Sequence, residues 1–377
     1  MNKKIIWGVI VIVVLIIIAI VVKKPASEAV KIGAIYTLTG PIASYGEFQK
    51  QSAETAVKEI NDAGGINGKP VELLIEDSAS DAKKGVDAYQ ALKLKGVKYY
   101  IVEYSPVAAA VRPLAVEDGN LVMTSGATTP AYIDGKDLSC RLTMTAKDIG
   151  PALAQYAREA GYTSKAVLLL PNNEYGTGLA QEFEKAYSAA DGVVIAKEFY
   201  DASGSADFRT NITKLKPLMS EAQVLITVNV ANTAQPMFEQ LQTLGWNKPI
   251  LSDYNTIQNP AIKDKKLVEG VAFVDWTYTP ESKATDSDLT KNFKSVYTKE
   301  HNANPTVAAA GYYDGVKIIL DAIQKSGTDP KKVAAYIKNL KNYEVITGTI
   351  VSFDEDCQAA RSNAIRKVQN GVVVDVK

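Results

Sequence analysis

The stretch TLTGPIASYGEFQKQSAETAVKEINDAGGING, residues 37–68, decides the fold class because it joins a loop to an amphipathic helix. Its apolar side chains recur with the spacing of one buried helical face, at Ala53, Ala56, Val57 and Ile60. Ser44 and Glu47 form a capping-box pattern, which predicts a helix that begins at about Tyr45 and ends at Gly64-Gly65. This helix start leaves free backbone N–H groups beside a tyrosine.

The same alternation of strand and helix extends outward from this stretch. A first set of apolar runs predicts strands at 30–36, 71–76, 97–102 and 120–124, with helices at 47–63, 81–95 and 107–116. The rhythm then restarts, with strands at 166–170, 193–199, 224–228 and 249–251 and helices at 149–160, 178–189, 208–219 and 234–244. Alternation of this kind indicates parallel sheets covered on both faces, so we expect an α/β protein with two lobes.

The last part of the chain changes character. Three further helices are predicted at 289–301, 306–325 and 331–340, and strand-like segments follow at 346–353 and 364–376. In open α/β sheets, ligands bind beyond the carboxyl ends of the strands. Two sheets that face each other across a gap are therefore expected to form a binding cleft, with the opening stretch on one wall.

The first 25 residues predict a membrane segment. An unbroken apolar run from Ile5 to Val22 lies between two lysine pairs and is long enough to span a bilayer. A cleaved signal peptide is the alternative, with 27–29 as a weak cleavage site, but two lysines and Pro25 directly behind the run favour an uncleaved anchor. Either way, the remainder of the chain is expected outside the cytoplasm.

The composition excludes several classes of function. Lysine plus arginine and aspartate plus glutamate both number 42, so no charge excess favours a nucleic-acid partner. The single histidine, His301, lies at a polar helix end, and no nucleophile motif, metal-ligand set or phosphate loop accompanies it. We therefore expect no catalytic residue, metal or cofactor. Cys140 and Cys357 fit either a disulfide or two separate buried thiols.

Several blocks in order resemble one known family. The segment 32–81 together with MTSGATTP, VLLLPNNEYGTGLAQEFEKA, DFRTNITKLK and AAAGYYDGVKIILDAIQKSG resembles the type I periplasmic binding proteins, specifically the leucine/isoleucine/valine and amide-binding group of ABC importers. The resemblance implies two Rossmann-like lobes, at 30–143 with 278–346 and at 144–277 with 347–377. It also implies three hinge crossings near 141–145, 276–280 and 346–350, which Cys140 and Cys357 would flank.

The resemblance also implies a ligand site built from both lobes. Tyr45 and Tyr175 match the cleft tyrosines, and Asp253 matches the acidic residue that meets the ammonium of an amino acid. The ligand carboxylate is expected at hydroxyl and backbone groups of Ser105, Gly126, Ala127 and Thr128. A zwitterion in a closing cleft needs such donors at one end and a carboxylate at the other. The alternative for each residue is local, with tyrosines that cap helices and polar groups that bind their own turns.

This sequence departs from the family pattern at Glu103, where a small residue is usual, at Pro106-Val107 after Ser105, and at Val230. These departures leave the ligand open, including a cationic one that faces Glu103. We expect a monomeric solute-binding protein, tethered outside the cytoplasm, that captures an amino acid or amide and delivers it to an ABC permease. A ligand-sensing ectodomain of the same fold is the alternative, and a secreted α/β enzyme is a less favoured one.

Overall fold

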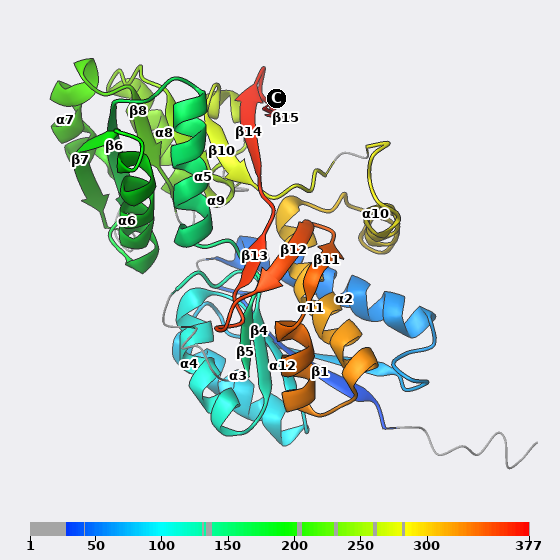
Figure 1. Ribbon diagram of the computed structural model, residues 1–377. Helices are drawn as coiled ribbons and strands as arrows, with labels where there is room; N and C mark the ends of the chain where they lie inside the picture. The colour runs from blue at the N-terminus through cyan, green and yellow to red at the C-terminus, as the bar shows by residue number, and fades with distance from the viewer. Residues whose placement is uncertain are drawn as a thin grey trace, which may run out of the picture.

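The chain forms two α/β lobes, which Figure 1 shows one above the other. The computed structural model describes residues 28–40, 42–129, 132, 138–201, 206–229, 233–258, 262–280 and 283–376. No helix within these ranges has the length and apolar character to cross a membrane. The anchor predicted at 1–25 lies outside the described residues and stays a prediction.

The first lobe is built on a five-stranded parallel sheet in the order β2-β1-β3-β4-β5. Its strands are β1 (Val30–Tyr36), β2 (Val71–Asp77), β3 (Tyr99–Val102), β4 (Leu121–Thr124) and β5 (Ser139–Arg141). Its sheet is covered by α2 (Gly46–Asp62), α3 (Ala82–Leu94), α4 (Ser105–Glu117) and, from late in the chain, α11 (Val307–Ser326) and α12 (Pro330–Lys338). The helix α10 (Asp288–His301) packs against α2. The late helices return to the first lobe because α11 packs along α2, where Ser52 Oγ donates to Ala309 O at 2.8 Å.

The second lobe is built on a seven-stranded sheet in the order β15-β14-β10-β9-β8-β6-β7. The parallel strands are β6 (Lys165–Pro171), β7 (Val193–Tyr200), β8 (Val224–Thr227), β9 (Ile250–Asp253) and β10 (Ala272–Asp275). The helices are α5 (Ala146–Glu159), α6 (Glu174–Ser188), α7 (Arg209–Leu215), α8 (Ala234–Thr243) and the short α9 (Tyr254–Ile257). The strands at the end of the chain, β14 (Ala364–Gln369) and β15 (Val372–Asp375), pair antiparallel at one edge.

A third, three-stranded antiparallel sheet corrects the predicted end of the chain. It contains β11 (Lys341–Val345), β12 (Gly348–Phe353) and β13 (Ala359–Arg361). The segment 346–350, expected as the third crossing, is instead the turn and first residues of the β11–β12 hairpin. The chain crosses to the seven-stranded sheet between β13 and β14 (Figure 1). The segment predicted as one strand at 364–376 is a hairpin, because Asn370 and Gly371 both adopt left-handed φ angles of 54° and 73°.

The start of α2 differs from the predicted capping box. Ser44 lies in a 3₁₀ turn (Ala43–Tyr45), and α2 begins at Gly46 without a side-chain cap. Glu47 accepts a hydrogen bond from Gln51 instead. The reason is that an N-cap residue has non-helical backbone angles, whereas Ser44 lies inside a helical turn. A Cβ at Gly46 would lie 2.4 Å from Thr37 O, so the helix start packs directly on the residue that follows β1. The predicted end of this helix at Gly64-Gly65 is confirmed by their φ angles of 96° and 75°.

Three crossings join the lobes, and one buried guanidinium contacts all of them. The first crossing is 142–145, the second starts at Trp276 after β10, and the third starts at Arg361 at the end of β13. Arg361 donates to Leu142 O at 3.2 Å, and its guanidinium lies 4.2 Å from the centre of the Trp276 ring. It also lies 3.5 Å from Asp314 of α11 in an ion pair that is almost completely buried.

A disulfide lies beside the same crossings. Cys140 of β5 and Cys357, in the loop before β13, are bonded to each other and fully buried. Arg141 N donates to Cys357 O at 2.9 Å, so a backbone hydrogen bond joins β5 and the loop before β13 in addition to the disulfide. The first lobe's last strand is therefore fixed to the segment that leads into the third crossing.

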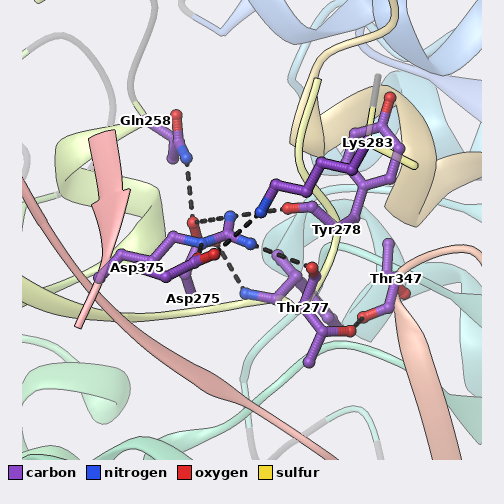
Figure 2. Close-up of polar contacts among 9 residues, drawn as sticks. Gln258, Asp275, Thr277, Tyr278, Lys283, Thr347 and Asp375 are labelled. Carbon is purple, nitrogen blue, oxygen red and sulfur yellow. Dashed lines mark hydrogen bonds and ion pairs between the residues drawn. The ribbon is translucent and has the colours of Figure 1, made fainter. Parts of the chain in front are cut away.

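A second buried arginine fixes the start of the second crossing. Figure 2 shows Asp275, Thr277 and Tyr278 at this start, with Thr347 beside them. Arg366 of β14 donates to Asp275 Oδ2 at 2.9 Å, to Tyr278 O at 2.6 Å and to Thr277 O at 3.0 Å. Thr277 in turn donates its hydroxyl to Thr347 O at 2.9 Å, in the β11–β12 turn. The second crossing is thereby held between the second lobe and the small sheet.

Candidate ligand-binding site

A cavity of about 180 Å³ lies where loops of the two lobes meet. The first lobe contributes residues that follow β1, β3 and β4 and the start of α11, and the second contributes residues that follow β6, β8, β9 and β10. These are carboxyl ends of parallel strands, as expected for an open α/β sheet. The lining consists of Ile42, Tyr45, Gln49, Tyr104, Ser105, Ser125, Gly126, Thr128, Tyr175, Asn229, Tyr254, Asn255, Trp276, Val307, Ala308, Gly311 and Tyr312.

Ser105 and Thr128 lie on the first-lobe wall and contact each other. The Ser105 hydroxyl oxygen accepts the backbone N–H of Thr128 at 3.1 Å and that of Thr129 at 3.3 Å. Its own proton is therefore directed elsewhere and is suited to donate to a ligand. Tyr104, which precedes Ser105, has a φ of 78°, a conformation that costs a non-glycine residue about 1–3 kcal/mol.

Tyr45 lies on the same wall, at the start of α2. Burial, followed by the nearby charge of Asp253, raises the pKa of its phenol to about 12. The phenol is therefore neutral at any physiological pH and acts as a hydrogen-bonding group and an aromatic cover. The cavity takes Tyr45 from the first lobe and Tyr254 from the second, so the two lobes approach each other here.

Tyr175 and Asp253 form a pair on the second-lobe wall. The Tyr175 hydroxyl donates to Asp253 Oδ2 at 2.6 Å, and the other carboxylate oxygen accepts from Thr256 N at 2.9 Å and Thr256 Oγ1 at 2.6 Å. Asp253 is fully buried, and burial raises its pKa even though these hydrogen bonds oppose the shift. Tyr175 lines the cavity, and Asp253 lies behind it.

The structure thus brings most of the predicted site together. Tyr45, Ser105, Gly126, Thr128 and Tyr175 line the cavity. Ala127 and Asp253 do not, since both are fully buried behind the lining. Ala127 N donates to Thr124 Oγ1 at 3.0 Å, so its role is to shape the loop. Asp253 reaches the cavity through the hydroxyl of Tyr175.

Several lining residues were not predicted from the sequence. Gln49 was detectable, because it lies one turn before Ala53 on the apolar face of α2, where a polar residue is unusual. Its side-chain oxygen accepts from Thr37 N at 3.0 Å and Thr37 Oγ1 at 3.2 Å. No comparable signal marks the aromatic lining residues contributed by distant segments: Tyr104, Tyr254, Trp276 and Tyr312.

The chemistry of the lining suits binding more than catalysis. None of the described residues that line the cavity is an aspartate, glutamate, histidine, lysine or arginine. In the part of the chain that the structure describes, no group of histidine, cysteine and acidic residues is arranged to hold a metal. What the cavity offers is hydroxyl and amide groups surrounded by aromatic rings, the usual composition of a small-molecule binding site.

Comparison with known proteins identifies the family. A family model described as periplasmic binding protein matches residues 29–372. The chain belongs to this family. Its members are solute-binding proteins and not enzymes, so this protein binds a ligand and does not transform it. Family membership also implies a location outside the cytoplasm.

Individual relatives of this periplasmic binding protein cover most of the chain. The Leu/Ile/Val-binding protein homolog 1 of Brucella abortus is 27% identical over 331 residues, which are 86% of each chain. The structure of a leucine binding protein from Thermotoga maritima superimposes with a TM-score of 0.81 at 25% identity, covering 93% of this chain and 98% of the other. A branched-chain amino acid transporter substrate binding protein from Streptococcus pneumoniae, in complex with isoleucine, gives 0.78 at 25% identity, with 92% and 98% covered.

Proposed function

We propose that this protein captures a small polar ligand, an amino acid or an amide, in the cavity between its lobes and delivers it to an ABC permease. The observation that carries the proposal is the cavity itself, which takes hydroxyl and aromatic groups from both lobes at the carboxyl ends of their strands. A ligand held by both walls stabilises the arrangement in which they are close. The relatives that bind leucine or isoleucine support this class of ligand and an ABC transporter as partner.

Within this proposal, Tyr45, Ser105 and Thr128 contact the ligand from the first lobe and Tyr175 from the second. The lobes move about the three crossings, which the disulfide and the two buried arginines keep in register. Asp253 acts through Tyr175, because its carboxylate holds the phenol hydroxyl that the ligand meets. We propose the predicted lobe bounds with one change: β11, β12 and β13, which the predicted bound at 346 divides between the lobes, are treated as a separate small sheet.

Thermal unfolding of the full chain with a panel of L-amino acids, their amides and urea tests the proposal. A ligand at a hundredfold excess over its Kd stabilises the folded form by about 2.7 kcal/mol, which gives a clear rise in Tm. We expect at least one panel member to produce it. Absence of any shift, together with no heat of binding by calorimetry, contradicts a binding function for this ligand class.

A matched pair of variants tests the site. Tyr175→Phe removes the hydroxyl at the cavity, and we expect it to weaken binding of the best panel member at least tenfold. Tyr187→Phe removes a hydroxyl from the same helix that donates to Tyr162 O at 2.8 Å, away from the cavity, and is expected to leave affinity unchanged. Equal affinities of the two variants would remove Tyr175 from the site. Stimulation of the ATPase activity of a cognate importer in proteoliposomes tests delivery.

A further inference from the structure

The loop that follows β4 has its backbone donors already in use. Ser125 N donates to Glu103 Oε1 at 3.0 Å, and the N–H groups of Gly126 and Ala127 donate to Thr124 Oγ1 at 3.3 and 3.0 Å. The next two N–H groups donate to Ser105 Oγ. All five backbone N–H groups from 125 to 129 thus have acceptors within the protein. A carboxylate of the ligand would have to displace one of these acceptors to use them.

An internal carboxyl group, that of Glu103, occupies the position of an anion at this loop. Glu103 follows β3, is fully buried, and accepts from Thr124 Oγ1 at 3.1 Å in addition to Ser125 N. Burial raises its pKa to about 8, and the hydrogen bonds from the loop oppose that shift. No cation takes part among the interactions described for this group. A buried carboxyl group with donors but no counter-charge is costly, and it is stabilised if a cation arrives.

Glu103 is separated from the cavity only by residues of the lining, Gly126 and Tyr312. A Cβ at Gly126 would lie 2.9 Å from Glu103 Oε2 and 3.3 Å from the hydroxyl of Tyr312. Gly126 and Tyr312 both line the cavity, so the carboxyl group and the phenol face the same point of its wall. The absence of a side chain at 126 keeps the carboxyl group close to whatever binds there.

The opposite wall has the same electrostatic character. Asp253 lies behind Tyr175 as Glu103 lies behind Gly126, and both are fully buried. The described lining contains no lysine, arginine or histidine that would offset them. Because charges act over longer distances in a buried site than in water, two such groups make the cavity favourable for cations.

We propose that the ligand presents a positively charged group, an amine, amidinium or guanidinium, to the wall formed by Gly126 and Tyr312, and that Glu103 is the counter-charge that selects it. The inference rests on the proposed binding function and narrows its ligand class. A neutral amino acid whose carboxylate lay at this wall would lack free N–H donors, and its negative charge would oppose the ionisation of Glu103 instead of favouring it. Glu103 is a positioning residue in this scheme, since Gly126 and Tyr312 stand between it and the ligand.

The pH dependence of binding follows from the groups around Glu103. The titratable groups that face it are Tyr36 from β1 and Tyr312 from α11, with Glu54 of α2 acting on Tyr36. Phenol and carboxyl groups cannot carry a positive charge, so none of these three residues can act as the counter-charge of Glu103. A bound cation favours ionised Glu103 and releases its proton. Affinity for a cation that stays charged in this range, such as a guanidinium, is therefore expected to rise between pH 7 and pH 9.

Calorimetry on the full chain with matched ligands tests the proposal without any variant. Leucinamide and agmatine lack the carboxylates of leucine and arginine, and we expect each to bind at least tenfold more tightly than its parent. The pH test uses agmatine, because its guanidinium stays charged across this range whereas the α-amine of leucinamide does not. Affinity for agmatine should rise from pH 7 to pH 9. Tighter binding of leucine than of leucinamide at pH 7, or an affinity for agmatine that falls from pH 7 to pH 9, overturns the proposal and leaves the binding function intact. Binding of none of the four overturns the proposal, and the wider panel of amino acids, amides and urea then decides the function separately.

A variant assigns the effect to Glu103. Glu103→Gln keeps the size of the side chain and removes its ability to carry a charge, so we expect at least a tenfold loss of affinity for agmatine at pH 9 and loss of the pH dependence of agmatine binding. Glu117→Gln changes an exposed residue at the end of α4 and serves as the matched control. A Glu103→Gln protein that binds the cation as tightly as the original, with the same pH dependence, overturns the role of Glu103.

Discussion

The disulfide provides a prediction whose size follows from the chain itself. Cys140 and Cys357 are separated by 217 residues, so their bond closes a very long loop in the unfolded chain. The loop-entropy relation gives a loss of about 18 cal/mol/K for a loop of this length, which is about 5 kcal/mol at 25 °C. Measured disulfide contributions are commonly about 2–4 kcal/mol, because native strain and residual structure reduce the ideal value. The Cys140→Ala, Cys357→Ala double variant is therefore expected to lose between about 2 and 5 kcal/mol.

Urea unfolding of the full chain, followed by fluorescence and by circular dichroism, measures this loss. The oxidised protein treated with a reductant should approach the double variant, and the reductant should leave the double variant unchanged. Because neither cysteine lies on the cavity lining, ligand affinity should be retained. A double variant whose unfolding midpoint stays within error of the parent refutes the claim that this bond stabilises the lobe junction.

Three further predictions concern buried groups. Arg361→Met leaves Asp314 buried without its ion-pair partner and is expected to cost about 3–5 kcal/mol in urea unfolding, whereas Arg158→Met on exposed α5 surface should be near neutral. Gly126→Ala places a Cβ 2.9 Å from Glu103, so we expect it to lower the free energy of unfolding by about 1–3 kcal/mol and to weaken ligand binding. Gly178→Ala is the control, because its Cβ meets only Ala146 at 3.5 Å, and it should be neutral or stabilising. Equal effects of the two variants would contradict the reasoning. The pKa of Glu103 is raised from its ordinary value to about 8, so the folded state holds more protons than the unfolded state between about pH 4.5 and 8, and this group lowers stability as pH rises through that window. Glu103→Gln should therefore raise Tm more at pH 8 than at pH 5, and an equal change at both would show that Glu103 does not titrate there.

The strand and helix pattern was readable from the sequence because burial imposes it locally. Runs such as 165–171 are buried on both faces in the second sheet, and the apolar face of α2 follows the predicted spacing. Short strands that have little local signal were missed, including Ser139–Arg141 and Ala359–Arg361. The third crossing was misplaced because a hairpin and a crossing both read as apolar runs next to turns. Only the pairing of β11 with β12 distinguishes them.

The candidate site was predictable where a family motif carried it and unpredictable where tertiary packing did. Tyr45, Ser105 and Tyr175 follow strands or begin helices, so their place near a sheet edge could be expected. Tyr312 comes from α11, a helix late in the sequence that returns to the first lobe, and no local pattern shows that return. Asp253 was expected to contact the ligand directly, but it lies behind Tyr175, and this position depends on a hydrogen bond between residues 78 apart in the sequence.

The position of Arg361 has a mechanical consequence for the lobes. Arg361 belongs to the third crossing, donates a hydrogen bond to the carbonyl of Leu142 in the first and stacks on Trp276 in the second. The three crossings therefore share one contact point. Trp276 also lines the cavity, so a ligand that contacts the indole ring acts on the contact between Trp276 and Arg361. We therefore expect ligand binding and the angle between the lobes to be coupled through the contact between Arg361 and Trp276.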